Sequence, residues 1–140
     1  MKASPRVGTV GEFHFTVEPQ HVIDFATDGM PAVLSTPKLI GLIERTSRET
    51  LVPFLEEDER SVGTEIDLRH VAPTPEGQKV TVIVRVVHAV DRAITFQVEV
   101  KDQQEVVARG LHKRAIIRIP NFARRVEGKR RPLSRADAAH

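Results

Sequence analysis

The segment LSTPKLIGLIERTSRETLVP (residues 34–53) is the one stretch of the sequence that is typical of a long helix, and the elements around it are placed relative to this helix. Ser35 and Thr36 are both suited to the N-cap, and Pro37 is suited to the first helical position, where its missing N–H would have no partner. Apolar residues recur at helical spacing, and the closing proline is disfavoured inside a helix. We therefore predict a helix from residue 37 to about residue 52.

The sequence on either side of this helix is typical of β-strands. Residues 11–18 alternate in polarity, and beyond residue 62 the period changes from helical to alternating, with many β-branched residues. Pro/Gly clusters and short polar turns divide this second region into predicted strands at 62–71, 79–90, 94–102 and 106–119. The order β-α-β-β-β-β predicts an α+β fold in which one five-stranded antiparallel sheet wraps one long helix.

The strand at 79–90 carries Val or Ile on both faces. One helix can cover only one face of a sheet, so we expect the second face or the edge of this strand to meet another subunit.

The composition excludes several classes of site. The chain of 140 residues has no cysteine, so it has neither a disulfide framework nor a thiol nucleophile, and this fits a reducing compartment. The N-terminal residues lack the apolar core of a secretory signal, and no apolar run is long enough for a membrane helix. We expect a cytoplasmic protein that does not associate with membranes.

Positive charge is concentrated at the C-terminus. Residues 121–140 hold six of the 21 basic residues and only two of the 19 acidic ones, so they account for the net charge of +2. We predict a single domain over 1–120 and a basic tail over 121–140. The tail is either solvated or binds phosphate on a nucleotide-bearing ligand or nucleic acid. Nucleic-acid sites usually add stacking aromatics, and only Phe122 is available, so we do not expect a nucleic-acid partner.

Two polar residues of the predicted helix have both a structural and a chemical interpretation. Thr36 can cap the helix, or its hydroxyl can join a proton relay beside the free N–H groups of the first turn. Glu44 lies on the margin of the apolar stripe. It can form a surface pair with Arg48 one turn later, or turn inward and act as a general base or nucleophile.

Two residues of the strand at 62–71 are further candidates. His70 closes this strand, and histidine is the side chain best suited to proton transfer near neutral pH. Gly63 is a residue type found where a backbone is approached closely. The other histidines show no metal-ligand spacing, so we predict no metal site; these are His14, His21, His88, His112 and His140.

Taken together, these residues resemble a known pattern. The element order resembles the hotdog fold, and the segments STPKLIGLIE, GTEIDLRHVAPTPEGQKVTV and ARGLHKRAIIRI resemble the fluoroacetyl-CoA thioesterase branch of hotdog thioesterases. The resemblance covers roughly residues 11–119. In that family a Thr at the helix start, a Glu within the helix and a His on the next strand form a catalytic triad, with a Gly near the acyl group. Thr36, Glu44, His70 and Gly63 match these places at the family's separations.

The resemblance implies an acyl-CoA thioesterase that needs no cofactor and works as a homodimer or a tetramer. The member specific for fluoroacetyl-CoA has an aromatic gate in the loop before the helix. Here that loop reads ATDGMPAV, with Met30 near the corresponding place and Phe25 further back. A flexible thioether packs without dictating one shape, so we expect a different or broader short-chain acyl group, with Met30 and Phe25 near it.

Geometry adds a constraint on the site. Thr36 and Glu44 are eight residues apart, about 12 Å along a helix, so they cannot bond to each other. Either they flank the thioester from two sides, or a partner subunit completes the site, and the dimers of this fold favour the second arrangement. The alternatives are an acyl-CoA binder without activity and a hotdog hydratase or dehydratase. The latter usually carries a His on or near the helix, and none lies in 37–52.

Overall fold

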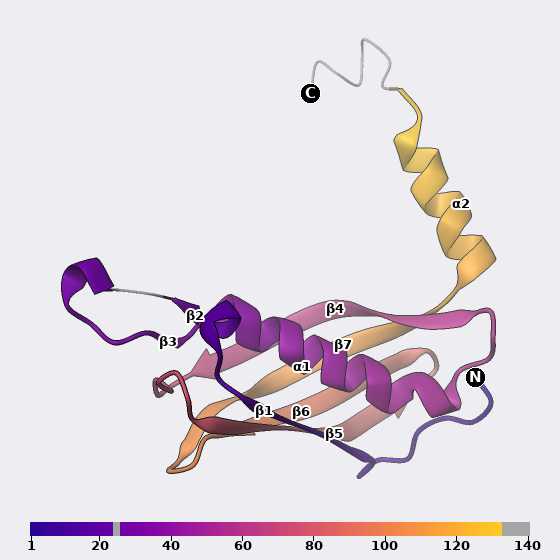
Figure 1. Ribbon diagram of the computed structural model, residues 1–140. Coiled ribbons are helices and arrows are strands. Elements are labelled where there is room, and N and C mark those ends of the chain that lie inside the picture. Colours follow the sequence, from indigo (N-terminus) through magenta and orange to yellow (C-terminus); the bar gives the residue numbers. More distant parts are fainter. Residues whose placement is uncertain (24–25, 133–140) are drawn as a thin grey trace.

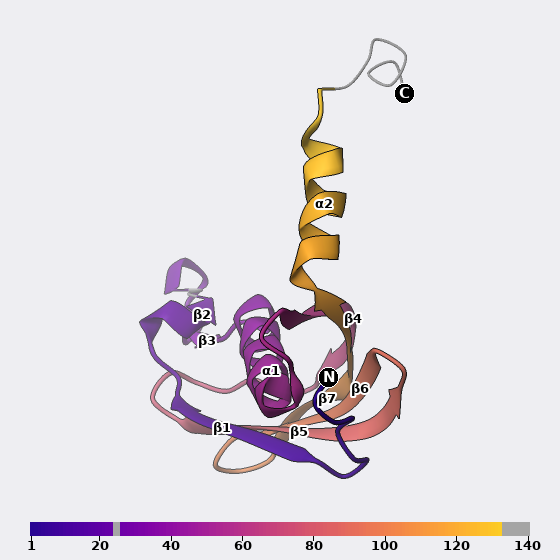
Figure 2. The ribbon, with the colours of Figure 1, turned by 90° about the vertical axis from the view of Figure 1, so that its right-hand side faces the viewer.

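The predicted helix is α1 (Thr36–Leu51), and it lies along the concave side of a five-stranded antiparallel sheet (Figures 1 and 2). The computed structural model describes residues 1–23 and 26–132. The strands of the main sheet are β1 (Val10–Thr16), β4 (Glu59–His70), β5 (Lys79–Val90), β6 (Ala93–Lys101) and β7 (Val106–Arg118). The α+β arrangement and the order of its main elements are therefore as predicted.

The first turn of α1 separates the roles of two neighbouring hydroxyls. Ser35 is the N-cap, and its Oγ accepts a hydrogen bond of 3.3 Å from the backbone N–H of Lys38. Thr36 is the first residue of the helix, so its side chain is not needed for capping. The helix ends at Leu51, and a 3-10 turn, η3 (Val52–Phe54), contains the proline that the sequence marks as the stop.

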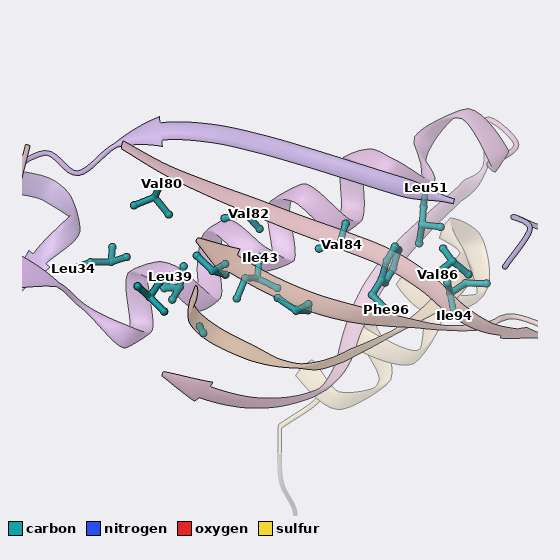
Figure 3. Packing of buried hydrophobic residues seen from close by; sticks show 14 of the residues in the cluster. Leu34, Leu39, Ile43, Leu51, Val80, Val82, Val84, Val86, Ile94 and Phe96 are labelled. Carbon is teal, nitrogen blue, oxygen red and sulfur yellow. The ribbon is translucent and has the colours of Figure 1, made fainter. Parts of the chain in front are cut away.

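The core lies between α1 and the concave face of the sheet (Figure 3). Alternate residues of β5 and β6 are fully buried, as expected for strands with one covered face. From the helix, Leu39, Ile43 and Leu51 pack onto them, with exposed fractions of 0%. Valine, isoleucine and leucine fill most of this core, and Phe96 is its largest side chain.

The order of strands in the sheet is β1-β5-β6-β7-β4. β5 is interior, with β1 and β6 paired on its two sides, so the prediction that the edge of 79–90 meets another subunit is wrong. The free edges belong to β1 and to the much longer β4. The stretch 63–67 of β4 is exposed at every residue, whereas β5 and β6 alternate between buried and accessible positions.

A small lobe precedes α1 at the end of the molecule where the helix begins (Figure 1). It contains two short strands that pair with each other and two 3-10 turns. They are η1 (Pro19–His21), β2 (Val22–Ile23), η2 (Ala26–Asp28) and β3 (Val33–Leu34). The backbone N–H of Ser35 donates to His21 O, which ties the lobe to the start of the helix.

The C-terminal segment differs from the prediction of a simple tail. α2 (Ile119–Arg130) follows β7 directly and projects away from the sheet (Figures 1 and 2). Pro120 lies in its first turn, where proline is favoured, and Ala, Arg, Glu and Lys later in the segment favour helix. The helix was not predicted from the sequence because the segment is highly charged. Of the predicted tail (121–140), residues 133–140 lie outside the described residues.

Candidate active site

Thr36 and His70 meet where α1 begins and β4 ends. Thr36 Oγ1 and His70 Nδ1 are 2.8 Å apart and share a hydrogen bond, although the residues are 34 positions apart in the sequence. Because Ser35 caps the helix, the Thr36 hydroxyl is free to make this contact. The structure thus brings together two of the predicted site residues as a hydroxyl–imidazole pair, the arrangement that proton transfer requires.

The second ring nitrogen of His70 is buried without a hydrogen-bond partner among the described residues. Burial lowers the pKa of His70 below its ordinary value of 6.5, and a backbone contact with Ala72 acts in the opposite direction. The ring is therefore neutral at pH 7. When Nδ1 carries the proton, Nε2 is a free base, and when Thr36 donates to Nδ1, Nε2 carries a proton that it can give away. Such unpaired buried groups are rare in proteins unless a ligand or catalytic role uses them.

Glu44 and Gly63 form a second cluster, further along α1 and β4. The Glu44 side chain is about half exposed, with 45% of its surface accessible, and it points toward β4 rather than toward Arg48. A Cβ atom added to Gly63 would lie only 3.0 Å from Glu44 Oε2, closer than nearly all real Cβ contacts. Glycine at position 63 thus leaves room for the carboxylate. Of the two alternatives for Glu44, the surface pair with Arg48 is not formed among the described residues, and the i, i+4 ion pair on this helix joins Arg45 and Glu49.

A buried arginine lies beneath this carboxylate. Arg114 Nη1 is 3.9 Å from Glu44 Oε2, and only 3% of the arginine side chain is exposed. Its Nε donates to Ser61 Oγ and its Nη2 donates to Ser61 O, both at 2.9 Å. Burial lowers the pKa of Arg114 and Glu44 raises it, but a guanidinium keeps its proton at any physiological pH. Arg114 is therefore a fixed positive charge next to an accessible carboxylate.

His112 completes the network and was not predicted from the sequence. Its Nδ1 lies 2.9 Å from Glu65 O, a carbonyl that can only accept, so Nδ1 carries the proton. Nε2 then accepts from Arg114 Nη1 at 3.1 Å. Burial is the largest cause that lowers the pKa of His112; the Glu65 carbonyl and Glu44 raise it, and Arg114 lowers it. A neutral His112 thus orients the guanidinium. The available signal was a His and an Arg at two inward positions of a strand that also turns Ala108 and Ile116 inward.

Glu44, Gly63 and His112 line an open hollow of about 230 Å³ at the edge of the sheet. Its other lining residues are Thr64, Glu65 and Ile66. Ile66 is 36% exposed, so the hollow offers an apolar wall as well as a carboxylate. This combination suits a small ligand that has an apolar group and a polar reacting centre.

The two clusters are separate within one chain. Among the described residues, no hydrogen bond or ion pair joins the Thr36–His70 pair to Glu44 or Arg114. Gly63 and His70 are seven residues apart on one extended strand, so they lie about 20 Å from each other. The structure therefore places the predicted residues in two groups rather than in one connected triad.

Of the two residues predicted near the acyl group, only Met30 is among the described residues. Met30 lies in the loop between η2 and β3 and is 52% exposed, but it does not line the Glu44 hollow. Phe25 lies outside the described residues.

The described residues contain no group of His, Cys, Asp or Glu side chains arranged to hold a metal ion. None of the helices in 1–23 and 26–132 has both the length and the apolarity to span a bilayer.

Comparison with known proteins places this chain in a family. The family model described as fluoroacetyl-CoA-specific thioesterase matches residues 17–119. The fluoroacetyl-CoA thioesterase of Streptantibioticus cattleyicolor is 31% identical over 137 residues, which cover 92% of this chain and 97% of the relative. The chain belongs to the fluoroacetyl-CoA-specific thioesterase family.

Solved structures agree with this family assignment. A mutant of the fluoroacetyl-CoA-specific thioesterase in complex with fluoroacetate and CoA superposes with a TM-score of 0.77 at 30% identity, over 84% of this chain and 99% of that one. A hot-dog-like protein from Thermanaerovibrio acidaminovorans has a TM-score of 0.79 at 23% identity, over 91% and 94% of the two chains. The hotdog fold predicted from the sequence is thereby confirmed.

Proposed function

We propose that this member of the family hydrolyses short-chain acyl-CoA thioesters to a free acid and CoA. The observation that carries the proposal is the Thr36–His70 hydrogen bond, which leaves the other imidazole nitrogen buried and unpaired among the described residues. Family membership supports it, because the curated relative acts on fluoroacetyl-CoA. Thr36, Glu44 and His70 are the proposed catalytic residues, and Gly63 is proposed to lie beside the acyl group.

Glu44 is the carboxylate proposed to act on the thioester carbonyl carbon. In a direct attack, its oxygen forms a bond to the acyl carbon, the carbon–sulfur bond breaks, and water then hydrolyses the resulting anhydride. In the alternative, Glu44 removes a proton from a water molecule that attacks the same carbon. In both routes His70 and Thr36 carry a proton, which ends on the departing thiolate. Solvent ¹⁸O incorporated into Glu44 after a single turnover would identify the direct route.

Negative charge that develops on the carbonyl oxygen needs donors at the same place. β4 is paired only with β7, so the N–H groups along its other edge near Gly63 are not used within the sheet. We propose that the groups near Gly63 that pairing with a second chain leaves free, or those of the first turn of α1, hold the oxyanion, as preorganised donors do in other acyl-transfer enzymes. The buried charge of Arg114 keeps Glu44 in place during the reaction.

We propose that the working unit is a homodimer whose two chains share each site. Every residue in 63–67 is exposed, which leaves both faces of the middle of β4 uncovered in a single chain. A strand of 12 residues with a free edge is a strong template for pairing with a second copy. Antiparallel pairing about a two-fold axis near the middle of β4 would bring His70 of one chain toward Gly63 of the other. This would unite the two clusters that a single chain keeps about 20 Å apart.

The acyl group is proposed to be short, and different from or broader than fluoroacetyl. The hollow beside Gly63 is small and has Ile66 as its apolar wall. The loop before α1 offers Met30, with Phe25 further back, as the side chains proposed to contact the acyl group. A cytoplasmic location is also part of the proposal, since the chain has no cysteine that would benefit from an oxidising compartment. The division into a domain over 1–120 and a basic C-terminal segment stays a proposal too.

Release of free thiol from a series of acyl-CoA esters of increasing chain length tests the function. We expect turnover to be greatest for the shortest acyl groups and to fall as the chain outgrows the hollow. Tight binding of acyl-CoA without turnover on any ester would contradict the proposal and favour a non-catalytic binding protein. Sedimentation or light scattering at the assay concentration should give at least twice the mass of one chain.

A further inference from the structure

The root of α2 forms a second hollow, of about 370 Å³, which the proposed reaction does not use. It lies where β7 passes into the helix and has a strongly basic lining with one aromatic ring. Its lining residues are Arg92, Ile116, Ile117, Arg118, Asn121, Phe122 and Arg125. Three guanidinium groups around one aromatic side chain are chemically suited to phosphate groups and a purine base.

The charges of this hollow are only partly neutralised. Arg92 is paired with the buried carboxylate of Glu59, and Arg118 is paired with Asp58 at 3.0 Å. Within residues 1–23 and 26–132, Arg125 forms no ion pair. The positive charge left over at this position therefore comes from Arg125, with further basic residues on the next turns of α2.

Phe122 supplies a surface for stacking. It is 40% exposed although it is a large apolar side chain, and it precedes Arg125 by three residues, so both lie on one face of the helix. No residue of α2 is buried in the chain. A helix of 12 residues with no buried face is only marginally stable in water, so a bound ligand or a neighbouring chain would stabilise it.

The hollow is connected to the Glu44 cluster through one strand. Arg114 and Arg118 are four residues apart on β7, which places them on the same face of the sheet and about 13 Å from each other. A CoA thioester has its phosphates and adenine at the far end of a long pantetheine arm. A thioester held at Glu44 and Gly63 can therefore extend its arm along this edge toward α2.

We infer that the hollow at the root of α2 binds the phosphorylated adenosine end of the CoA thioester, with Arg125 contacting phosphate and Phe122 stacking on the base. This inference rests on the proposed function. It makes the basic C-terminal segment a substrate-binding element of the thioesterase.

Two substrates that share the acyl group and differ in the nucleotide test the inference. One is acetyl-CoA, and the other is the acetyl thioester of N-acetylcysteamine, which has neither phosphate nor adenine. Arg125→Glu should raise KM for acetyl-CoA by about tenfold or more, the effect of losing a charge-assisted contact, and leave kcat unchanged. KM for the N-acetylcysteamine ester should not change. Phe122→Ala should raise KM in the same selective way.

Arg85→Glu is the matched control, because it makes the same charge change at an exposed position of β5 remote from α2. It should leave both KM values as in the wild type. A rise in KM for acetyl-CoA as the salt concentration increases, smaller in Arg125→Glu, would add support, because ion contacts are screened.

The outcomes separate this inference from the proposed function. If the wild type hydrolyses neither ester, the proposed function fails. If it hydrolyses both and Arg125→Glu leaves KM for acetyl-CoA unchanged, the inference alone is overturned. Equal rises of KM for the two esters would also overturn it, since they would show a general disturbance of the site. If Arg125→Glu loses binding to a single-stranded DNA oligonucleotide but keeps the wild-type KM for acetyl-CoA, the inference is overturned and α2 is assigned to nucleic-acid binding.

Discussion

The two clusters of candidate residues are built in opposite ways. The Thr36–His70 pair has a single hydrogen bond and a buried nitrogen left without a partner, so it is arranged to exchange protons. The Glu44 cluster contains a buried arginine held by Ser61 and His112, so its charge is fixed and only the carboxylate is accessible. One region can change its protonation state, and the other places a buried guanidinium of constant charge next to the accessible carboxylate. A hydrolase that breaks a thioester needs both properties at one carbonyl group.

Among the predicted changes in activity, the greatest is expected when the carboxylate of Glu44 is removed. Glu44→Gln is nearly isosteric, and we expect it to lower kcat by about 100-fold to 10,000-fold, the usual contribution of a catalytic acid or base. Glu49→Gln is the matched control on the same helix, since Glu49 is exposed and its one ion pair among the described residues is with Arg45. Thiol release from acetyl-CoA measures both. Near wild-type turnover in Glu44→Gln would remove this residue from the mechanism.

A similar or somewhat smaller loss of activity is expected when Thr36 or His70 is replaced. His70→Ala should reduce turnover about 100-fold, and Thr36→Val should also reduce it, whereas Thr36→Ser keeps the hydroxyl and most of the activity. Because burial lowers the pKa of His70 below 6.5, activity should fall only as pH drops below that value. A pH profile of kcat/KM with an acid limb above pH 6.5 would argue against His70 as the group that titrates.

A moderate loss of activity is expected when Gly63, which is proposed to lie beside the acyl group, is replaced. In Gly63→Ala the new methyl group would lie 3.0 Å from Glu44 Oε2, so the carboxylate must move. We expect kcat/KM to fall about tenfold, and further for longer acyl groups, as is typical of overpacking. Gly41→Ala is a suitable control, because nothing lies within 4 Å of a Cβ atom at this exposed position of α1. Equal losses for acetyl and longer esters would show that Gly63 does not contact the acyl group.

The smallest effect concerns stability and its dependence on pH. His112→Gln removes a buried ring that accepts from Arg114, and we expect a loss of about 1–3 kcal/mol in the free energy of unfolding. Burial lowers the pKa of His112 and of His70 below 6.5, so below that pH the unfolded chain binds more protons than the folded one. Stability should therefore fall as pH drops below 6.5, and the fall should be smaller in His112→Gln. Denaturant unfolding between pH 5 and pH 8 measures both.

The contrast between the clusters also explains what the sequence could predict. Strong periodicity predicted α1 and the four strands after it, and the resemblance to the thioesterase family pointed to Thr36, Glu44, His70 and Gly63, whose roles stay proposals. The hydrogen bond between Thr36 and His70 is possible because Ser35 is the N-cap. The sequence could not predict this, because Ser35 and Thr36 are both suited to the N-cap position. The network beneath Glu44 depends on contacts between α1, β4 and β7, which no local pattern contains.

Two other features were missed for physical reasons. The valines on both faces of 79–90 predicted a partner at the second face or at the edge of this strand, but β5 is interior, and the long uncovered edge belongs to the more polar β4. The C-terminal segment was not predicted to be helical, because it is highly charged and none of the residues of α2 is buried in the chain. Pattern alone could not predict either feature, because each depends on neighbouring strands or on surfaces outside the chain.

The central claim is that the two clusters act on one thioester across a subunit interface. Mixing Glu44→Gln with His70→Ala after dissociation and reassociation tests it directly, because each mixed dimer would contain one site with both residues intact. Random mixing should restore about a quarter of wild-type activity from two inactive parents. If the mixture exchanges subunits and yet stays as inactive as its parents, each chain holds its own complete site and the account of a shared site is wrong.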